Sequence, residues 1–426
     1  MRIPVESYTL PNGLRVVLSQ DHATPVVAVN LWYHVGSANE RHGRTGFAHL
    51  FEHMLFQGSA QVAANEHFEL VQRAGGTLNG STWLDRTNYF ETMPSHQLEL
   101  ALWLEADRMA RLLPAMTQEK LDTQRDVVKN ERRWSVDNQP YGTWWERLPA
   151  LCFPSEHPFH HSLIGSMEDL SEASLEDVAA FFRTYYTPDN AVLTIAGDFD
   201  VTTARAMVER HFGSIPRGRG RPPLPDMSVP STFGEWRREV VPDAVIAPRL
   251  FLVFRVPAAG HGDWYAASML GAVLGLGEGS RLPKRLVREL QIASDAGAYT
   301  FDLSKGCDLL ICDVTARPGV RAERLEAEVV AEVERLIADG VTAEERERAL
   351  ALFETTWIAG LQSAASRADK LSQFATYKGD ATLVNAEPSR HAAITVEAMN
   401  VFARAQLGAD NRASLLYVPR AAEEVA

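Results

Sequence analysis

The sequence predicts an α+β fold built from two homologous halves, each a mostly antiparallel β-sheet flanked by α-helices. Three observations lead to this expectation. At 426 residues, the chain exceeds the size of one ordinary hydrophobic core. A segment rich in proline, glycine and arginine, residues 216–234, interrupts every regular hydrophobic period. On each side of it, an apolar strand leads through a loop into an apolar helix, and strands and amphipathic helices follow. We therefore expect one domain over 1–215, a linker over 216–234 and a second domain over 235–426.

The first half begins with a strand, a Pro-Asn-Gly turn and a second strand over Leu14–Ser19. A longer apolar strand, Val26–Val35, leads through a charged loop to a short apolar helix. Two amphipathic helices are predicted at Gln97–Leu113 and Gln118–Trp134, where apolar residues recur with helical spacing. The apolar run Ala191–Gly197 predicts a further buried strand. These elements alternate in the manner of an α+β domain.

The second half repeats this order of elements. The strand Pro248–Val256 is followed by a helix at Trp264–Leu276, then by a strand near Leu309–Ala316 and a helix at Ala322–Asp339. The likeness between the halves is one of pattern rather than of residue identity, and it predicts a duplicated unit.

The composition limits the classes of function. Hydrophobic residues make up 46% and charged residues 23%, which is typical of a soluble globular protein. The formal net charge of −13 argues against nucleic acid as a partner. No run approaches the ~20 apolar residues of a membrane-spanning helix, and the N-terminal residues have no signal-peptide core. The three cysteines form no C-x-x-C pair and favour buried thiols over disulfides. These features predict a cytoplasmic protein without membrane partners.

The string His49-Leu50-Phe51-Glu52-His53 is the most informative feature of the chain. Positions i and i+4 share one face of a helix, so His49 and His53 can point two imidazoles at one metal ion. Glu52 lies beside them and can reach a water molecule at that ion. The surrounding helix is apolar nearly all round, and buried imidazole and carboxylate groups are costly unless they are paired or bind a metal. The H-x-x-E-H string therefore predicts a metal site.

A catalytic zinc site of this kind needs a third protein ligand. Glu131 is the best candidate because Leu121, Gln124, Val128 and Glu131 fall on one face of the predicted helix. Glu119 is a competitor, but it stands at the helix start, where a glutamate already interacts favourably with the helix dipole. A solvent-exposed role is the common fate of a glutamate, and helical geometry alone leaves the choice open.

With these residues, the sequence resembles the pitrilysin family of zinc peptidases, which includes insulin-degrading enzyme and the mitochondrial processing peptidase. The resemblance spans nearly the whole chain and reaches well beyond the H-x-x-E-H string. Its other matches are Asn12-Gly13-Leu14, Gly36-Ser37, Gly46 through Ser59, Gly75-Gly76, Asn79, Asp85, Thr87, Tyr89, Tyr186, Pro188, Asn190 and Gly197-Asp198.

This resemblance implies a zinc-dependent endopeptidase that acts on peptides or small unfolded proteins. It implies one Zn²⁺ per chain, with His49, His53 and Glu131 as ligands and Glu52 as the catalytic base. Residues 1–215 would then be the catalytic zinc-binding domain and residues 235–426 an inactive homologue. The chain length is similar to that of the short-chain bacterial branch, whose subunits pair into a clam-shell dimer around a chamber.

Two departures from the family pattern concern the site. Gln124 occupies a place where the family usually has a glutamate. Active members also carry an arginine and a tyrosine seven residues apart that bind the substrate carbonyl. Here Arg288 is present, but position 295 is aspartate and Tyr299 comes four residues later. The chain therefore resembles the zinc-bearing subunit of a heterodimer whose paralogous partner supplies the Arg/Tyr pair. The alternative is a self-sufficient homodimer in which Tyr299 acts.

The segment Gly75–Met93 alternates in strand fashion after a flexible Gly-Gly pair. In family members this segment is an edge strand to which the substrate adds as a further strand, so Asn79, Gly80 and Ser81 are expected to bind substrate together with Arg288. Phe56 is expected to line the pocket beside the metal.

A non-catalytic assembly subunit is the competing function, because the core proteins of respiratory complexes resemble this family. Those proteins have degraded metal motifs, whereas the motif here is intact. The physiological substrate and the cleavage preference do not follow from the sequence.

Overall fold

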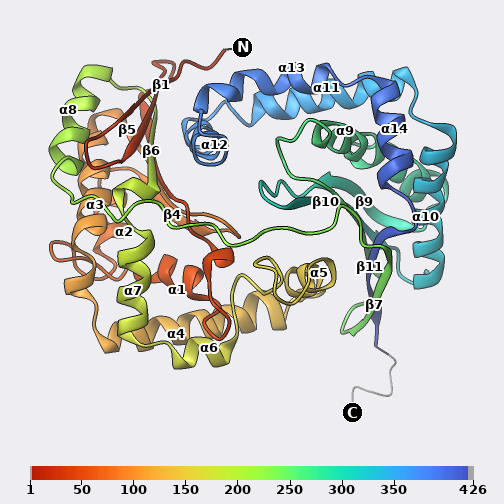
Figure 1. The fold of residues 1–426 in the computed structure, drawn as a ribbon, viewed down its shortest axis with the longest axis horizontal. Helices are drawn as coiled ribbons and strands as arrows, with labels where there is room; N and C mark the ends of the chain where they lie inside the picture. The colour runs from red at the N-terminus through yellow and green to blue at the C-terminus, as the bar shows by residue number, and fades with distance from the viewer. Residues whose placement is uncertain (1, 421–426) are drawn as a thin grey trace. The chain divides into compact units, whose positions relative to one another are not determined.

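The computed structural model describes residues 2–420 (Figure 1). These residues form two compact units. The first unit comprises residues up to Arg133, His161–Pro225 and Ile358–Ala386. The second comprises Trp134–His160, Asp226–Trp357 and the residues from Glu387 onward. Within the described residues, no helix combines the length and the apolar character that a membrane crossing requires.

The first unit contains a six-stranded sheet with the order β1-β2-β6-β3-β5-β4. Only the pair β2–β6 is parallel; the other neighbours are antiparallel. Its strands are β1 (Glu6–Thr9), β2 (Arg15–Gln20), β3 (Val26–Tyr33), β4 (Thr77–Thr82), β5 (Thr87–Pro94) and β6 (Ala191–Gly197). The strand β4 lies at one edge of this sheet, which matters for the site below.

The second unit contains a five-stranded sheet with the order β7-β11-β8-β10-β9. Its strands are β7 (Glu235–Asp243), β8 (Arg249–Pro257), β9 (Ala293–Thr300), β10 (Cys307–Ala316) and β11 (Asn411–Pro419). Here too a single pair, β7–β11, is parallel. The order matches β2-β6-β3-β5-β4 strand for strand, and this confirms that the fold consists of two homologous α+β halves.

Helices cover these sheets. Those of the first unit are α1 (Phe47–Met54), α2 (Glu66–Arg73), α3 (Leu98–Arg111), α4 (Gln118–Arg132), α6 (Met167–Glu172), α7 (Leu175–Tyr185), α8 (Val201–Phe212) and α12 (Ala364–Tyr377). The remaining helices are α5 (Trp144–Cys152), α9 (Trp264–Gly275), α10 (Ala322–Asp339), α11 (Ala343–Ala359), α13 (Glu387–Ala392) and α14 (Val396–Gln406). All of these belong to the second unit except the last two residues of α11.

The first sheet has helices on both faces. On one face, the helices α1 and α3 bury an apolar core that includes Tyr33, Phe51 and Tyr89, all fully buried. On the other face, α12 packs against β3 and β6, and its Asp369 accepts hydrogen bonds from the side chains of Asn30 and Trp32. The sheet is therefore buried on two sides, with a segment from late in the chain forming the second layer (Figure 1).

The chain passes between the units inside the expected linker, between Pro225 and Asp226. Two further segments depart from the expected domains of 1–215 and 235–426. Residues 134–160, which contain α5, belong to the second unit, and residues 358–386, which contain α12, belong to the first. The helix α5 packs on β7 and β11, which explains why its residues group with the second sheet.

Candidate metal centre and catalytic base

The helix α1 carries both histidines of the H-x-x-E-H string, and its start is fixed by two features. Gly46 precedes the helix at φ 84°, and a Cβ at this position would lie 2.6 Å from the carbonyl oxygen of Ile164. Only glycine fits both the left-handed backbone and this close approach. The buried carboxylate of Glu40 accepts hydrogen bonds from the backbone N–H groups of Gly46 and Ala48, at 2.8 and 2.7 Å. These bonds satisfy donors that a helix start leaves open.

The helix α4 supplies the third polar side chain. Thr117 caps its N-terminus, and the hydroxyl oxygen of Thr117 accepts a hydrogen bond from the backbone N–H of Lys120. The face predicted from the sequence is the buried one, since Leu121, Gln124 and Val128 are each at most 6% exposed. This face packs against α1 and directs Glu131 toward the two histidines. Glu119 is exposed in the first turn of the helix and does not belong to the group.

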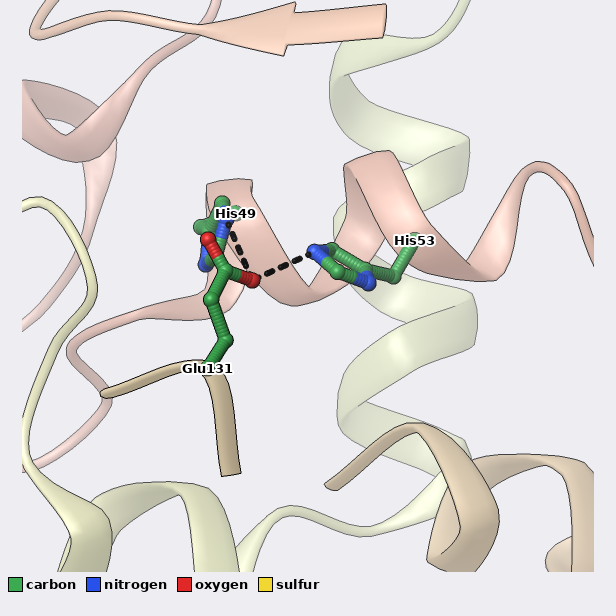
Figure 2. A group of neighbouring side chains, drawn as sticks. All are labelled: His49, His53 and Glu131. Atoms are coloured by element: carbon green, nitrogen blue, oxygen red, sulfur yellow. Dashed lines mark ion pairs between the residues drawn. The ribbon is translucent and has the colours of Figure 1, made fainter. Parts of the chain in front are cut away.

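His49, His53 and Glu131 converge (Figure 2). One ligand atom from each lies within 4.8 Å of the other two. The Oε2 atom of Glu131 is 3.6 Å from Nε2 of His49 and 3.2 Å from Nε2 of His53. The two rings stand nearly perpendicular, at 79°, with their centroids 4.8 Å apart. Among residues 2–420, these three are the His, Cys, Asp or Glu side chains that lie close enough together to hold a metal ion.

The donor set fits zinc. Two imidazole nitrogens and one carboxylate oxygen are a known ligand set of catalytic zinc sites. Tetrahedral bonds of about 2.0–2.1 Å place ligand atoms about 3.3 Å apart, and the Glu131–histidine distances of 3.6 and 3.2 Å bracket this value. The side chains are partly enclosed, with 10% of His49, 22% of His53 and 36% of Glu131 exposed, so an ion would keep access to solvent.

The charges of the three groups depend on one another. Burial, together with the neighbouring His53, lowers the pKa of His49 to about 4. Burial also opposes the charged form of His53, but the hydrogen bond and the charge of Glu131 outweigh it and raise the pKa of His53. The hydrogen bond with His53 in turn lowers the pKa of Glu131. A carboxylate that attracts a proton onto the neighbouring imidazole offers the same attraction to a metal cation.

Glu52 lies on α1 between the two histidines in sequence and faces β4. Its Oε2 accepts a hydrogen bond of 2.6 Å from the hydroxyl of Thr82. Burial raises the pKa of the Glu52 carboxyl, and the hydrogen bond from Thr82 acts against this rise. A buried carboxylate with a raised pKa takes up a proton more readily than an exposed one, which suits a general base.

The expected substrate-binding residues of the first unit divide into three settings. Asn79 is exposed on β4, and its Oδ1 accepts a hydrogen bond from the backbone N–H of Gly80. Gly80 is buried against α1, since a Cβ there would lie 3.0 Å from Cγ of Glu52. Ser81 is half-buried and donates a hydrogen bond to Asn88 on β5. Asn79 and Ser81 thus lie on the face of β4 that points away from α1.

Phe56 follows α1 and is only 9% exposed. Its ring packs against Phe68 and Tyr89, and the guanidinium of Arg108 lies over it at 5.2 Å. The ring also reaches Gly80, where a Cβ would lie 3.2 Å from it. Phe56 is therefore a core side chain that supports β4. That it lines a pocket beside the metal stays a prediction.

Gln124, which departs from the family pattern, is buried and shares a hydrogen bond with His53. That bond helps to raise the pKa of His53, and it gives the neutral amide a position next to a candidate ligand. Glutamine can orient the imidazole by hydrogen bonding without adding a second negative charge.

Arg288, Asp295 and Tyr299 all belong to the second unit. Arg288 is exposed in the π-helical turn η6 (Pro283–Glu289), and Asp295 is exposed on the edge strand β9. Tyr299 is also on β9 and is 39% exposed. In the second unit, the helix α9 occupies the place that α1 has in the first, and it carries no histidine, cysteine, aspartate or glutamate.

Fold and site together define a peptidase that uses zinc. Residues 15–152 match the family model described as insulinase, peptidase family M16, and residues 172–353 match the peptidase M16 inactive domain. The zinc protease PqqE of Helicobacter pylori is 33% identical over 374 residues, which cover 87% of this chain and 83% of that protein. The chain belongs to peptidase family M16, the pitrilysin family of zinc peptidases, and its cofactor is Zn²⁺.

Further relatives agree with this assignment. An uncharacterized zinc protease of Mycobacterium tuberculosis is 30% identical over 399 residues, covering 93% of this chain and 89% of that one. The crystal structure of a protease from Helicobacter pylori superposes with a TM-score of 0.91 at 29% identity, covering 98% of this chain and all of that one. The match of residues 172–353 to an inactive domain agrees with the motif-free helix α9.

The hydrogen bond from Thr82 to Glu52 is a feature of the site that the sequence did not indicate. Thr82 stands 30 residues from Glu52, and only the packing of α1 against β4 brings the two together. The sequence did offer one sign of this contact. Gly80 and Thr82 are two residues apart in a strand, so they share a face and point toward the same covering element.

Proposed function

We propose that this chain is a zinc-dependent endopeptidase that cleaves peptides or small unfolded proteins, working as the zinc-bearing subunit of a heterodimer. The observation that carries the proposal is the convergence of His49, His53 and Glu131, with the carboxylate of Glu52 close enough to interact electrostatically with His53 and Glu131. In a merely structural zinc site, protein ligands fill all four positions. Here three side chains converge, and a buried carboxylate stands next to them.

In this proposal, His49, His53 and Glu131 hold the ion. When bound, Zn²⁺ polarises the scissile carbonyl group and makes water a stronger acid. Glu52 accepts a proton from the attacking water at its carboxylate and then donates it to the leaving amine nitrogen. Its place on the same helix as two ligands keeps the carboxylate within a turn of both histidines.

The substrate binds along β4. This strand is at the edge of the first sheet and pairs with β5 on its inner side. An extended peptide can add to such an edge through backbone hydrogen bonds, which depend little on side-chain identity. Asn79, Gly80 and Ser81 would lie along the bound peptide, and Phe56 would support the strand from beneath. This mode suits cleavage within varied unfolded segments.

A second subunit is proposed because the Arg/Tyr pair is incomplete. Tyr299 stands four residues beyond the position that the family pattern requires, a displacement of about 13 Å along an extended strand. The side chain at that position, Asp295, is an exposed carboxylate that would repel a carbonyl oxygen. A paralogous chain would then supply the arginine and tyrosine and close the chamber. The alternative is a homodimer in which Arg288 and the half-exposed Tyr299 act together.

The test is hydrolysis of an internally quenched peptide by the zinc-loaded chain alone and by the chain mixed with a paralogue that lacks the metal motif. The proposal expects cleavage in the mixture and little or none by the chain alone. Cleavage by the chain alone that disappears in Tyr299→Phe would support the homodimer instead. Zinc-loaded chain that cleaves no peptide in either setting would contradict the peptidase role and favour an assembly subunit.

A further inference from the structure

We propose that Thr82 is a positioning residue that holds the Glu52 carboxylate in place for proton transfer. This inference deepens the proposed function and rests on it. The hydroxyl of Thr82 donates a hydrogen bond of 2.6 Å to Oε2 of Glu52. Bonds from a hydroxyl to an ionised carboxylate are short and about twice as strong as bonds between neutral groups.

The hydroxyl has a clear preference for Glu52. Its other acceptor nearby, the carbonyl oxygen of Ala48, is 3.5 Å away and belongs to the helix α1. Thr82 is 7% exposed, and a buried hydroxyl is costly unless it finds a good partner. A valine would fill the same strand position without that cost, so the presence of a hydroxyl here indicates that its hydrogen bond has a role.

The strand β4 confines Glu52 from a second side. Gly80 shares a face with Thr82, and a Cβ at Gly80 would lie 3.0 Å from Cγ and 3.3 Å from Oε1 of Glu52. The Glu52 side chain therefore lies against the strand in the space that a side chain at position 80 would otherwise fill. Thr82 binds one carboxylate oxygen, and Gly80 leaves room for the other.

Thr82 is itself held by its neighbours. It pairs with Thr87 at the closed end of the β4–β5 hairpin. On the opposite face of the sheet, the guanidinium of Arg86 donates to the carbonyl oxygen of Ser81 at 2.8 Å and to Oδ1 of Asn88 at 3.0 Å. Asn88 in turn donates to Asp369 of α12. The residue next to Thr82 is thus tied to two further elements, so the hydroxyl is presented from a fixed backbone.

The role predicts a specific pattern of effects. Loss of the hydroxyl should let the Glu52 side chain rotate, which slows the proton transfer but leaves the three zinc ligands and the edge of β4 unchanged. The rate constant kcat should fall while KM and zinc content stay near their wild-type values. A general loss of folding would instead lower zinc content and kcat together.

The experiment compares Thr82→Val, which keeps the shape and removes the hydroxyl, with Thr82→Ser, which keeps the hydroxyl. Zinc content is measured for each protein. The constants kcat and KM are measured with a quenched peptide under the conditions in which wild type cleaves it. We expect Thr82→Val to lower kcat about tenfold to hundredfold, from the strength of a hydrogen bond to a charged group. Thr82→Ser should stay within about threefold of wild type, because it retains the same bond.

Crystal structures of the zinc-loaded wild type and both variants provide a readout that does not need activity. The proposal expects the Glu52 carboxylate in one position in wild type and Thr82→Ser, and displaced in Thr82→Val. It is overturned if Thr82→Val keeps the wild-type position of Glu52, if its kcat equals that of wild type, or if Thr82→Ser is as impaired as Thr82→Val. If wild type cleaves nothing either alone or mixed with a paralogue, the proposed function fails, and the position of Glu52 still decides the role of Thr82.

Discussion

The helix α4 carries two glutamates in different settings. Glu131 is a candidate zinc ligand, and Glu119 is an ordinary surface glutamate. Glu131 faces both histidines, while Glu119 is exposed in the first turn. Glu131→Gln should remove most of the bound zinc, to less than about one tenth of the wild-type content after dialysis, because an amide oxygen is a weaker ligand than a carboxylate. Metal analysis of dialysed protein measures this. Glu119→Gln is the matched control and should retain the full content; equal zinc in both variants would exclude Glu131 as a ligand.

His67 on α2 makes folding stability sensitive to pH. Burial, reinforced by the charge of Arg108, lowers its pKa from 6.5 to about 4, with Glu105 acting in the opposite direction. Between these values the unfolded chain binds more protons than the folded one, so stability rises with pH and is lost as pH falls from 6.5 toward 4. This one group accounts for about 2 kcal/mol between pH 7 and pH 5.

Urea denaturation of wild type and His67→Gln at pH 7 and pH 5 tests this expectation. The drop in stability on acidification should be smaller in the variant, which has no imidazole to protonate. The same drop in both proteins would mean that His67 keeps an ordinary pKa in the folded state.

At the scale of elements, the packing of α1 against β4 depends on Gly80. A side chain at this position would meet Cγ of Glu52 and the ring of Phe56 within 3.0 and 3.2 Å. Gly80→Val should therefore lower peptide hydrolysis by roughly 10²-fold or more, as expected for a displaced general base, with zinc retained because the ligands lie on α1 and α4. Thr77→Val, at the exposed start of the same strand, is the control and should change little. A Gly80→Val variant that loses its zinc would show that the clash disturbs α1 as a whole.

The sequence predicted the strongly periodic elements well. The strand β6 and the helix α10 occupy the predicted ranges, Ala191–Gly197 and Ala322–Asp339, because their apolar periods are long and cleanly bounded. The alternating pattern of Gly75–Met93 predicts one strand, but the segment forms two, β4 and β5. The turn between them, residues 83–86, contains no glycine, proline or asparagine, and its single aspartate, Asp85, is a weak turn signal by itself.

The candidate site could be predicted only in part for a related physical reason. Spacing along one helix places His49, Glu52 and His53 together. A local period predicts the buried face of α4, and the family resemblance then favours Glu131 on that face. The contact between Glu52 and Thr82 depends instead on how a helix packs on a strand 30 residues away. Neither spacing nor propensity reports such a contact, because it is a property of tertiary packing.

At the scale of the whole molecule, the two sequence halves exchange segments. The helix α12, from late in the chain, covers one face of the first sheet, where Ala368 packs against the buried Ala28 and Ala196. A fragment of residues 1–225 would expose this face to water. We expect it to be poorly soluble or to lack a cooperative unfolding transition, since the sheet needs both covering layers.

Co-expression of residues 1–225 with residues 226–426 should restore a cooperative transition, because the second fragment brings back α12. Thermal unfolding of the fragment, the co-expressed pair and the intact chain provides the comparison. Cooperative unfolding of the isolated fragment with a full complement of zinc would contradict the assignment of α12 to the first unit.

The central claim is that Glu52 performs proton transfer beside a zinc ion held by His49, His53 and Glu131. The most direct test measures zinc content and peptide cleavage on the same preparations of wild type and Glu52→Gln, in the assembly that supports wild-type cleavage. Glu52→Gln should bind as much zinc as wild type and cleave roughly 10²–10⁴-fold more slowly, the range expected on removal of a general base. Equal zinc with wild-type cleavage would contradict this mechanism.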